Sequence, residues 1–233
     1  MDTGLQTLRP LQVVPNGLSV VALTWDPYRP DDLLVAATDN NIWRVNVTSS
    51  GVVRTLLTQQ TLPGVRQISW DHNGDLLVVG EVFGDVMWRV DPLSGARTTI
   101  LSYPLPSVRC GAQNPQTGDY YIGTQQGLWR VAGVPSGTPS ATLVAPTPSA
   151  VTSIAFDPLL PQFVLFTRSQ DLYRLDMNTL VVEPIWTGTQ AIDLTRTAHD
   201  GTFRAIRSRD VPPGRCFAAG LRRGVHGRQP AGR

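Results

Sequence analysis

Few residues of this chain have the type and spacing that catalysis needs. His72, His199 and His226 are far apart, and no Ser-His-Asp order or nucleophile elbow surrounds them. Clusters of Asp and Asn at 26–32 and 38–41 offer the oxygen ligands that calcium prefers, without the spacing of a known calcium loop. Turn formation explains both clusters, because these side chains bond their own backbone in turns. We therefore expect no catalytic residue, no metal ligand and no cofactor.

A different set of residues recurs regularly. An arginine preceded by an aromatic residue returns at intervals of 45, 41 and 44 residues, in "NIWRV" (41–45), "VMWRV" (86–90), "GLWRV" (127–131) and "DLYRL" (171–175). An arginine is costly to bury without a partner, and an Asp or Asn precedes each motif at a similar distance. We expect an ion pair within each unit, weaker in the third unit because its partner is Asn114. The repeated residues are Trp43, Arg44, Trp88, Arg89, Trp129, Arg130, Tyr173 and Arg174, with Asp26, Asp71 and Asp157.

The elements that position these residues are short strands. Each unit contains four runs rich in Val, Ile, Leu, Thr and aromatic residues, separated by Gly, Pro, Asn and Asp, and no run has a helical period. The second run is almost continuously apolar, as in "DLLVAAT" (32–38), which predicts a strand buried on both faces. Four strands in 40–45 residues are typical of a β-propeller blade. Because strand side chains alternate, Trp43 and Val45 should face one neighbouring blade and Ile42 and Arg44 the other.

The sequence therefore predicts an all-β fold, a β-propeller of four-stranded antiparallel blades with four clear blades and a partial fifth. The propeller is expected over 1–208, and the tail at 209–233, rich in Arg, Gly and Pro, is expected to be disordered. Two architectures remain possible. One is a five-bladed ring completed by Leu8–Val14 and Arg215–Leu221, and the other is an open arc of a larger propeller. The units are 18–60, 61–104, 105–147 and 148–189, with the partial unit at 190–208.

Composition and charge limit the kinds of protein that this chain can be. The chain has 233 residues, 41% of them apolar and 16% charged, which is the balance of a folded chain. Residues 1–203 hold 12 arginines against 17 acidic residues, whereas 204–233 hold 8 against 1. The basic end has a single aromatic residue, Phe217, and no lysine, so we do not expect nucleic-acid binding. No signal peptide or membrane span is recognisable, which favours a cytoplasmic protein, and Cys110 is expected to be a small buried side chain.

The units resemble the β-propeller superfamily. Their length and their Val…Trp-Asp…Gly…Leu run are similar to Trp-Asp repeats, although the third strand carries Trp-Arg and no Gly-His pair opens a unit. "MWRVDPLSG" (87–95) and "LYRLD" (172–176) are similar to NHL, gluconolactonase-like and quinoprotein-like propellers. The gluconolactonase resemblance would imply a central divalent metal held by Glu, Asn and Asp. The chain has only two glutamates, Glu81 and Glu183, and no matching set surrounds them.

These observations predict a non-enzymatic scaffold that binds a protein or a small ligand. The alternatives are a lactonase-like or quinoprotein-like enzyme, or its remnant, and a truncated gene product without independent function. Binding residues usually lie on loops held by a rigid scaffold. The loops expected around the channel are 38–41, 81–85, 124–127 and 167–171, and the links between units, 59–64, 103–107, 145–150 and 187–190. Their candidate binding residues are Asp39, Asn40, Asn41, Glu81, Phe83, Asp85, Gln125, Gln126, Arg168 and Asp171.

Overall fold

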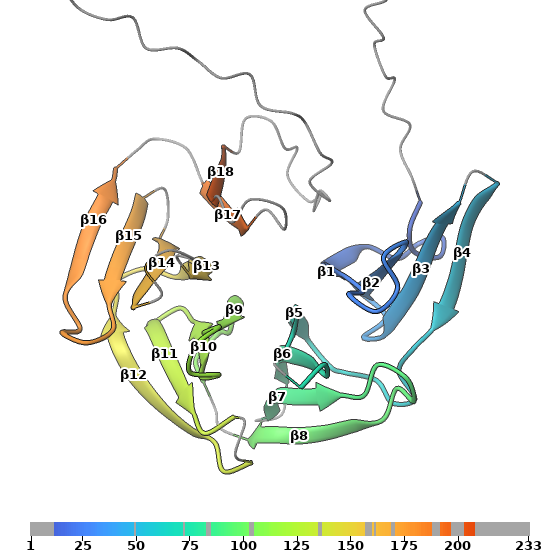
Figure 1. Cartoon of the computed structure of the whole chain (residues 1–233), viewed down its shortest axis with the longest axis horizontal. Helices are drawn as coiled ribbons and strands as arrows, with labels where there is room; N and C mark the ends of the chain where they lie inside the picture. The colour runs from blue at the N-terminus through green and yellow to red at the C-terminus, as the bar shows by residue number, and fades with distance from the viewer. Residues whose placement is uncertain are drawn as a thin grey trace, which may run out of the picture.

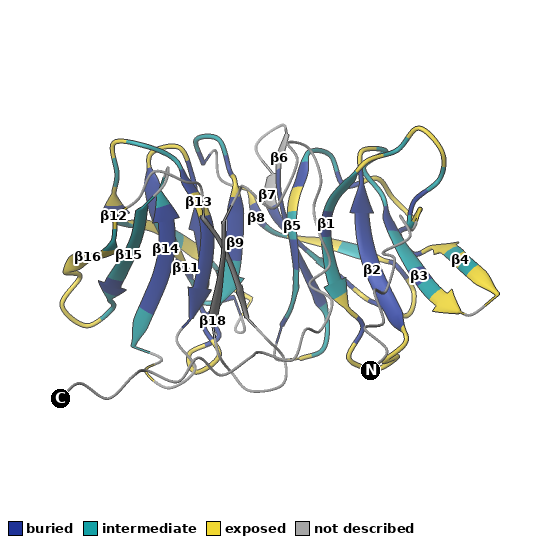
Figure 2. Ribbon diagram, turned by 90° about the horizontal axis from the view of Figure 1, so that it is seen from above, coloured by how far each residue is buried: buried dark blue, intermediate teal, exposed yellow. Residues whose placement is uncertain are grey.

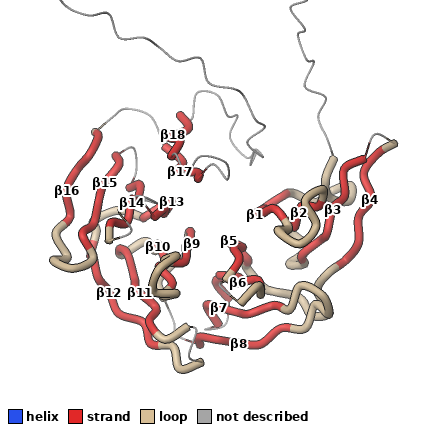
Figure 3. Tube along the Cα trace, viewed as in Figure 1, coloured by secondary structure: helices blue, strands red, loops and turns tan. Residues whose placement is uncertain are grey.

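The described part of the chain consists of strands and loops (Figure 3). The computed structural model describes residues 12–48, 50–71, 73–82, 85–102, 105–134, 137–156, 160, 162–168, 171–187, 192–196 and 203–207. These residues include no helix, and therefore none able to cross a membrane. The predicted all-β class is confirmed.

Four sheets of four antiparallel strands, each in sequence order, form the blades. The first blade contains β1 (Val20–Trp25), β2 (Asp32–Ala37), β3 (Ile42–Thr48) and β4 (Gly51–Leu56). The second contains β5 (Val65–Trp70), β6 (Leu76–Val82), β7 (Asp85–Val90) and β8 (Arg97–Ser102). The third contains β9 (Cys110–Gln113), β10 (Tyr120–Gly123), β11 (Gly127–Ala132) and β12 (Ser140–Pro146). The fourth contains β13 (Val151–Phe156), β14 (Phe163–Arg168), β15 (Asp171–Asp176) and β16 (Val182–Trp186).

The blades stand side by side around an axis (Figure 1). The first strand of each blade lies innermost, and β1, β5, β9 and β13 contact one another in series. A two-stranded sheet, β17 (Ile192–Arg196) and β18 (Phe203–Arg207), follows the fourth blade and contacts β13 and β14. The chain therefore has the propeller fold, with four complete blades and a partial fifth. The described strands form an open arc, with the opening between β17–β18 and β1 (Figure 1).

The core is divided among the interfaces between blades. All six residues of β2 are buried, as its continuous apolar run predicted, because a blade covers each neighbour with its whole face. Ile42 packs towards the second blade, whereas Trp43 and Val45 pack on the opposite face, as predicted from their alternation. Burial is concentrated in the inner strands, and exposed residues gather on β4 and β16 (Figure 2).

The link before each first strand places an apolar side chain against a blade. Leu62 is buried between the first two blades and Leu105 between the second and third, each followed by a proline. Val14 has the same position before β1 and packs on the first blade with Leu33 and Val35. Residues 12–14 are not a strand, and the rest of the predicted closing strand Leu8–Val14 lies outside the described residues. Arg215–Leu221 and the tail at 209–233 also lie outside them.

One irregularity recurs in the innermost strands. The register shifts between Val20 and Ala22, between Val65 and Gln67, and between Val151 and Ser153. Each shift leaves one extra residue in the first strand, which is the pattern of a β-bulge. Bulges turn a side chain out of the regular alternation, so the innermost strands present residues that the alternation would have hidden.

Candidate functional site

The predicted binding loops lie at one end of the arc. β2 and β14 both point to the upper edge of Figure 2, so the loops that follow them emerge there. In an antiparallel blade, the link to the next blade must emerge at the same end. We call this end the upper rim, and its described parts include 12–19, 37–41, 57–66, 105–109, 124–126, 145–150, Arg168 and Asp171.

The loop of the first blade is bonded to the links on both sides. Asn40 accepts from Leu62 N at 2.7 Å through its main-chain oxygen and from Gly64 N at 3.1 Å through Oδ1. On the other side, Thr38 N donates to Ser19 O at 3.0 Å. Asn40 has a φ of 64°, a left-handed conformation that asparagine tolerates better than most residues. Asn40 therefore fixes the rim instead of projecting from it.

The loop of the third blade repeats this arrangement with other residues. Gln125 N donates to the carbonyls of Pro106 and Ser107, each at 3.2 Å, and Thr147 N donates to Gln126 O at 3.0 Å. These bonds use only main-chain atoms of the two glutamines. Because both side chains are exposed, their amides remain available on a fixed backbone.

Asp39 and Asn41 are used within their own loop. Asp39 Oδ2 accepts from Trp43 Nε1 at 3.0 Å and its Oδ1 accepts from Asn41 N at 3.2 Å. Asn41 Oδ1 accepts from Thr58 Oγ1 at 3.3 Å. The structure thus brings Asp39, Asn40 and Asn41 together at the rim and gives all three structural bonds.

Arg168 and Asp171 meet through a tyrosine that sequence analysis assigned to the repeat. Arg168 Nη2 donates to Tyr173 Oη at 2.8 Å, and Tyr173 Oη donates to Asp171 Oδ2 at 3.2 Å. The guanidinium also lies 4.6 Å from the centre of the tyrosine ring. Desolvation raises the pKa of Tyr173, an effect that Arg168 opposes. This cluster is the rim of the fourth blade.

Several of the remaining candidates lie wholly or partly outside the described residues. Glu81 lies in β6 and Asp85 begins β7, but the description does not cover their side chains. Phe83 and Asp157 lie outside the described residues. Glu183 lies in β16, the outermost strand of its blade. No group of three or more possible metal ligands occurs among the described residues.

Sequence analysis did not predict a role for two exposed arginines at the rim, Arg66 and Arg109. Arg66 is the extra residue of the bulge in β5, and Arg109 directly precedes β9 at the equivalent position. Arg66 lies in β5 and Arg109 directly before β9, and these two strands are the innermost of their blades (Figure 1). The sequence carried a signal, because "VRQ" at 65–67 and "VRC" at 108–110 follow the same link. The adjacent Cys110 is buried, as predicted.

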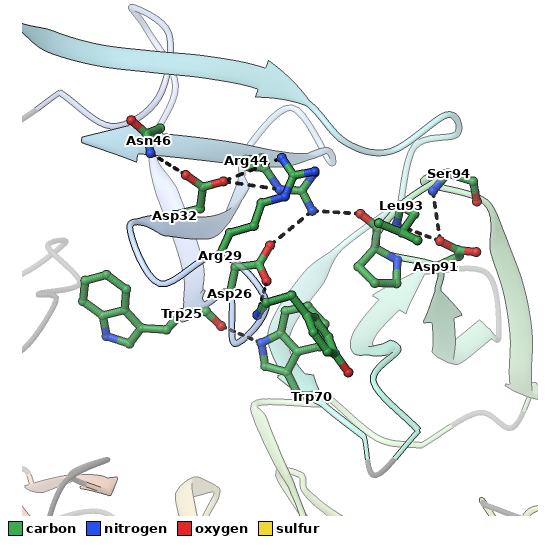
Figure 4. Close-up of polar contacts among 12 residues, drawn as sticks. Trp25, Asp26, Arg29, Asp32, Arg44, Asn46, Trp70, Asp91, Leu93 and Ser94 are labelled. Atoms are coloured by element: carbon green, nitrogen blue, oxygen red, sulfur yellow. Dashed lines mark hydrogen bonds and ion pairs between the residues drawn. The ribbon is translucent and has the colours of Figure 1, made fainter. Parts of the chain in front are cut away.

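The repeated arginines lie towards the opposite end, between blades. Arg44 Nη2 lies 3.2 Å from Asp26 Oδ2, and Arg44 Nε lies 3.8 Å from Asp32 Oδ2 (Figure 4). The same Nη2 donates to Pro92 O of the second blade at 2.8 Å. The predicted pair with Asp26 is present, and it also joins two blades.

The second blade repeats this geometry. Arg89 Nε lies 3.3 Å from Asp71 Oδ2 and 3.5 Å from Asp75 Oδ2. Arg89 Nη2 donates to Val134 O of the third blade at 3.3 Å.

The third blade departs from the prediction. Arg130 pairs with Asp119, at 2.8 Å from Nε, and not with Asn114. Asn114 Oδ1 instead accepts from Gln116 N and Thr117 N in the turn that follows β9. The prediction of a weak Asn114–Arg130 pair was therefore wrong, because Asn114 bonds the backbone of its own turn and Asp119, directly before β10, pairs with Arg130.

In the fourth blade, Arg174 Nη2 donates to Glu183 Oε2 at 2.6 Å. Both side chains are substantially exposed, so this pair is a surface pair unlike the buried pairs of the first two blades.

A pocket of about 370 Å³ lies beside Arg44, between the first two blades. Two carboxylates in its lining, Asp75 and Asp91, have pKa values shifted in opposite directions. Burial, and to a lesser degree Asp71, raises the pKa of Asp75 above its ordinary value, whereas Arg89 lowers it. The main-chain N–H groups of Ser94 and Leu93 hold the pKa of Asp91 below its ordinary value. Tyr28 and Trp70 meet edge to face at 5.7 Å, and Tyr28 lines the pocket wall.

Comparison with known proteins identifies the fold of this chain but no family. No protein-family model and no curated protein matches its sequence. Its structure is similar to one in the crystal structure of a nidogen/laminin complex, with a TM-score of 0.65 and 14% identity over 82% of this chain and 72% of that chain. It is also similar to an auxiliary nutrient binding protein from Bacteroides ovatus, with a TM-score of 0.61 and 13% identity over 81% of this chain. The chain spans about half, 52%, of that second protein. At these identities the similarity shows the propeller fold.

Proposed function

We propose that this chain is a non-enzymatic binding module that holds a protein or small-ligand partner on its upper rim. The observation that carries this proposal is the bonding of the rim loops to one another. Asn40 joins the first loop to the following link, and Gln125 and Gln126 join the third loop to the links on both sides. Loops fixed in this way lose little conformational freedom when a partner binds.

The rim also presents suitable chemistry. Gln125 and Gln126 each offer amide donors and an acceptor, and Arg66 and Arg109 add positive charge beside the channel. Arg168, Tyr173 and Asp171 form a second polar group on the fourth blade. A surface of this kind favours a polar partner recognised through hydrogen bonds.

The structural neighbours support a binding role. One was solved in a complex of nidogen with laminin, and another is described as a nutrient binding protein. Propellers serve many functions, so these neighbours support binding as one role of the fold, and experiment must identify the partner.

Site-specific photo-crosslinking tests the proposal. A photo-reactive amino acid replaces Gln125 at the rim, and the same amino acid replaces Gln116 as the matched control. Gln116 is an exposed glutamine of the same blade, in the turn between β9 and β10 at the opposite end. We expect a discrete covalent adduct in native cells from position 125 and none from position 116.

The adduct then defines the affinity measurement. The double variant Gln125→Arg, Gln126→Arg should weaken binding of the crosslinked partner at least tenfold, while Gln116→Arg should leave it unchanged. Equal crosslinking at positions 125 and 116, or unchanged affinity of the double variant, would exclude the upper rim as the binding surface.

A further inference from the structure

The third blade departs from the repeated arginine geometry, and a pocket lies beside the altered arginine. We infer that this pocket, between the third and fourth blades, binds a small molecule with one carboxylate and an apolar body. The site is separate from the upper rim and does not depend on the function proposed for it.

The first two blades show what this arginine position accepts. Arg44 has two carboxylates within 4 Å, Asp26 and Asp32, and Arg89 likewise has Asp71 and Asp75. A single guanidinium at this position therefore tolerates two negative charges, because its five donors can serve several acceptors.

Arg130 has only one carboxylate among the described residues, Asp119. The position of Asp26 and Asp71 is taken by the neutral Asn114, whose Oδ1 bonds the backbone of its own turn. Relative to its two counterparts, Arg130 lacks one negative partner.

Arg130 also lacks the contact with the next blade. Arg44 and Arg89 donate to Pro92 O and Val134 O of the following blades, whereas the hydrogen bonds of Arg130 among the described residues go to Asp119 of its own blade. Its side chain is correspondingly 45% exposed, against 14% for Arg44 and 27% for Arg89. The guanidinium keeps donors that face the space between the blades.

A pocket of about 340 Å³ occupies that space, within the size range of small-ligand sites. Among the described residues that line it, Arg130 alone is charged. The rest is largely apolar and includes Tyr121, Val144, Leu175, Met177 and Leu180. An arginine at the edge of an apolar pocket fits a ligand whose carboxylate pairs with the guanidinium while its body covers Val144 and Leu180. The ligand carboxylate would supply the second negative partner that Asn114 does not.

Methyl NMR of the whole chain with benzoate as the probe tests this inference. We expect saturable shifts of the Leu175 and Leu180 methyl signals, and at least tenfold weaker binding of benzamide, which has the same shape without the charge. Arg130→Gln should weaken benzoate binding at least tenfold.

Asn114→Asp gives the sharper test, because it restores the residue of the first two blades and supplies the missing carboxylate internally. It should weaken benzoate binding at least tenfold in a protein that stays folded by circular dichroism. Arg174→Gln, which alters an arginine outside the pocket, is the matched control and should bind benzoate as the unaltered chain does. Equal binding of benzoate and benzamide, or full benzoate affinity in Asn114→Asp, would overturn the inference.

Discussion

Arg44 of the first blade donates a hydrogen bond from Nη2 to the main-chain oxygen of Pro92 in the second blade, at 2.8 Å. The same guanidinium pairs with Asp26, which is only 2% exposed. One side chain thus satisfies a buried carboxylate and joins two blades that also share an apolar cluster.

Removing this arginine should destabilise the chain strongly. Arg44→Met leaves the carboxylate of Asp26 buried without its charged partner, so we expect a loss of about 3 kcal/mol in the free energy of unfolding. Urea unfolding followed by circular dichroism measures the loss. Arg174→Met is the matched control and should lose less than about 1 kcal/mol, because its pair with Glu183 is exposed. Similar losses in the two variants would contradict a special role for the buried pair.

The two carboxylates near Pro92 should change stability with pH in opposite directions. The folded state raises the pKa of Asp75, so this group contributes stability while it is protonated, and that contribution is lost as the pH rises through its folded pKa. The folded state lowers the pKa of Asp91, so its contribution is present above the unfolded pKa and is lost as the pH falls.

Asp75→Asn should therefore be neutral or slightly stabilising at pH 7, and Asp91→Asn should be destabilising there. Both differences from the unaltered chain should shrink as the pH falls below the ordinary range of aspartate. Thermal unfolding between about pH 3 and pH 7 checks both variants. A destabilised Asp75→Asn at pH 7 would show that its contact with Arg89 outweighs its burial.

Gly80 lies where a larger residue cannot fit. A Cβ at this position would lie 2.6 Å from Cζ3 of Trp88 and 3.0 Å from Gly64 O. Trp88 is 1% exposed and packs in the core between the first two blades, so we expect Gly80→Ala to lose about 1–3 kcal/mol in urea unfolding.

The first blade supplies the control for Gly80. Ala37 pairs with Val20 as Gly80 pairs with Val65, so the two positions are equivalent. Ala37→Gly creates no clash and should cost about 1 kcal/mol or less. A Gly80→Ala variant as stable as the unaltered chain would mean that Trp88 can shift.

Metal binding distinguishes the binding module from an enzyme of the lactonase type. A metal that binds the folded state raises the melting temperature, by an amount equivalent to about 2.7 kcal/mol at a hundredfold excess over its dissociation constant. For a non-enzymatic module we expect no shift with calcium or zinc, and none on adding a chelator. A clear rise in the melting temperature that a chelator reverses would instead favour a lactonase-type enzyme.

The strands were predictable because their signal is local. The apolar run that became β2 and the aromatic–arginine motif that became β3 follow from burial on both faces of a blade. The pairing of Arg44 with Asp26 was also predictable, since the same residue types return at the same spacing in the second unit. The finer assignment to NHL or Trp-Asp repeats stays a prediction.

The contacts between elements were not predictable from spacing. Asn114 aligns with Asp26, yet the strand register brings Asp119 to Arg130. Asn40 is a polar loop residue of the type that often binds a partner. In the structure, however, its main-chain oxygen and its Oδ1 accept hydrogen bonds from the link that follows the first blade. Sequence analysis did not select Arg66, because its exposure on the innermost strand depends on a bulge in β5. The alternation of side chains along a strand does not reveal such a bulge.

The bond from Arg44 to Pro92 has a direction along the chain. Its acceptor lies 48 residues after its donor, and the acceptor of Arg89 lies 45 residues after that arginine. At ribosomal rates, 48 residues take about 2–10 s to synthesise. Each of these arginines must therefore wait for the following blade to leave the ribosome, and a nascent chain interrupted after one blade would carry a cation whose final partner does not yet exist.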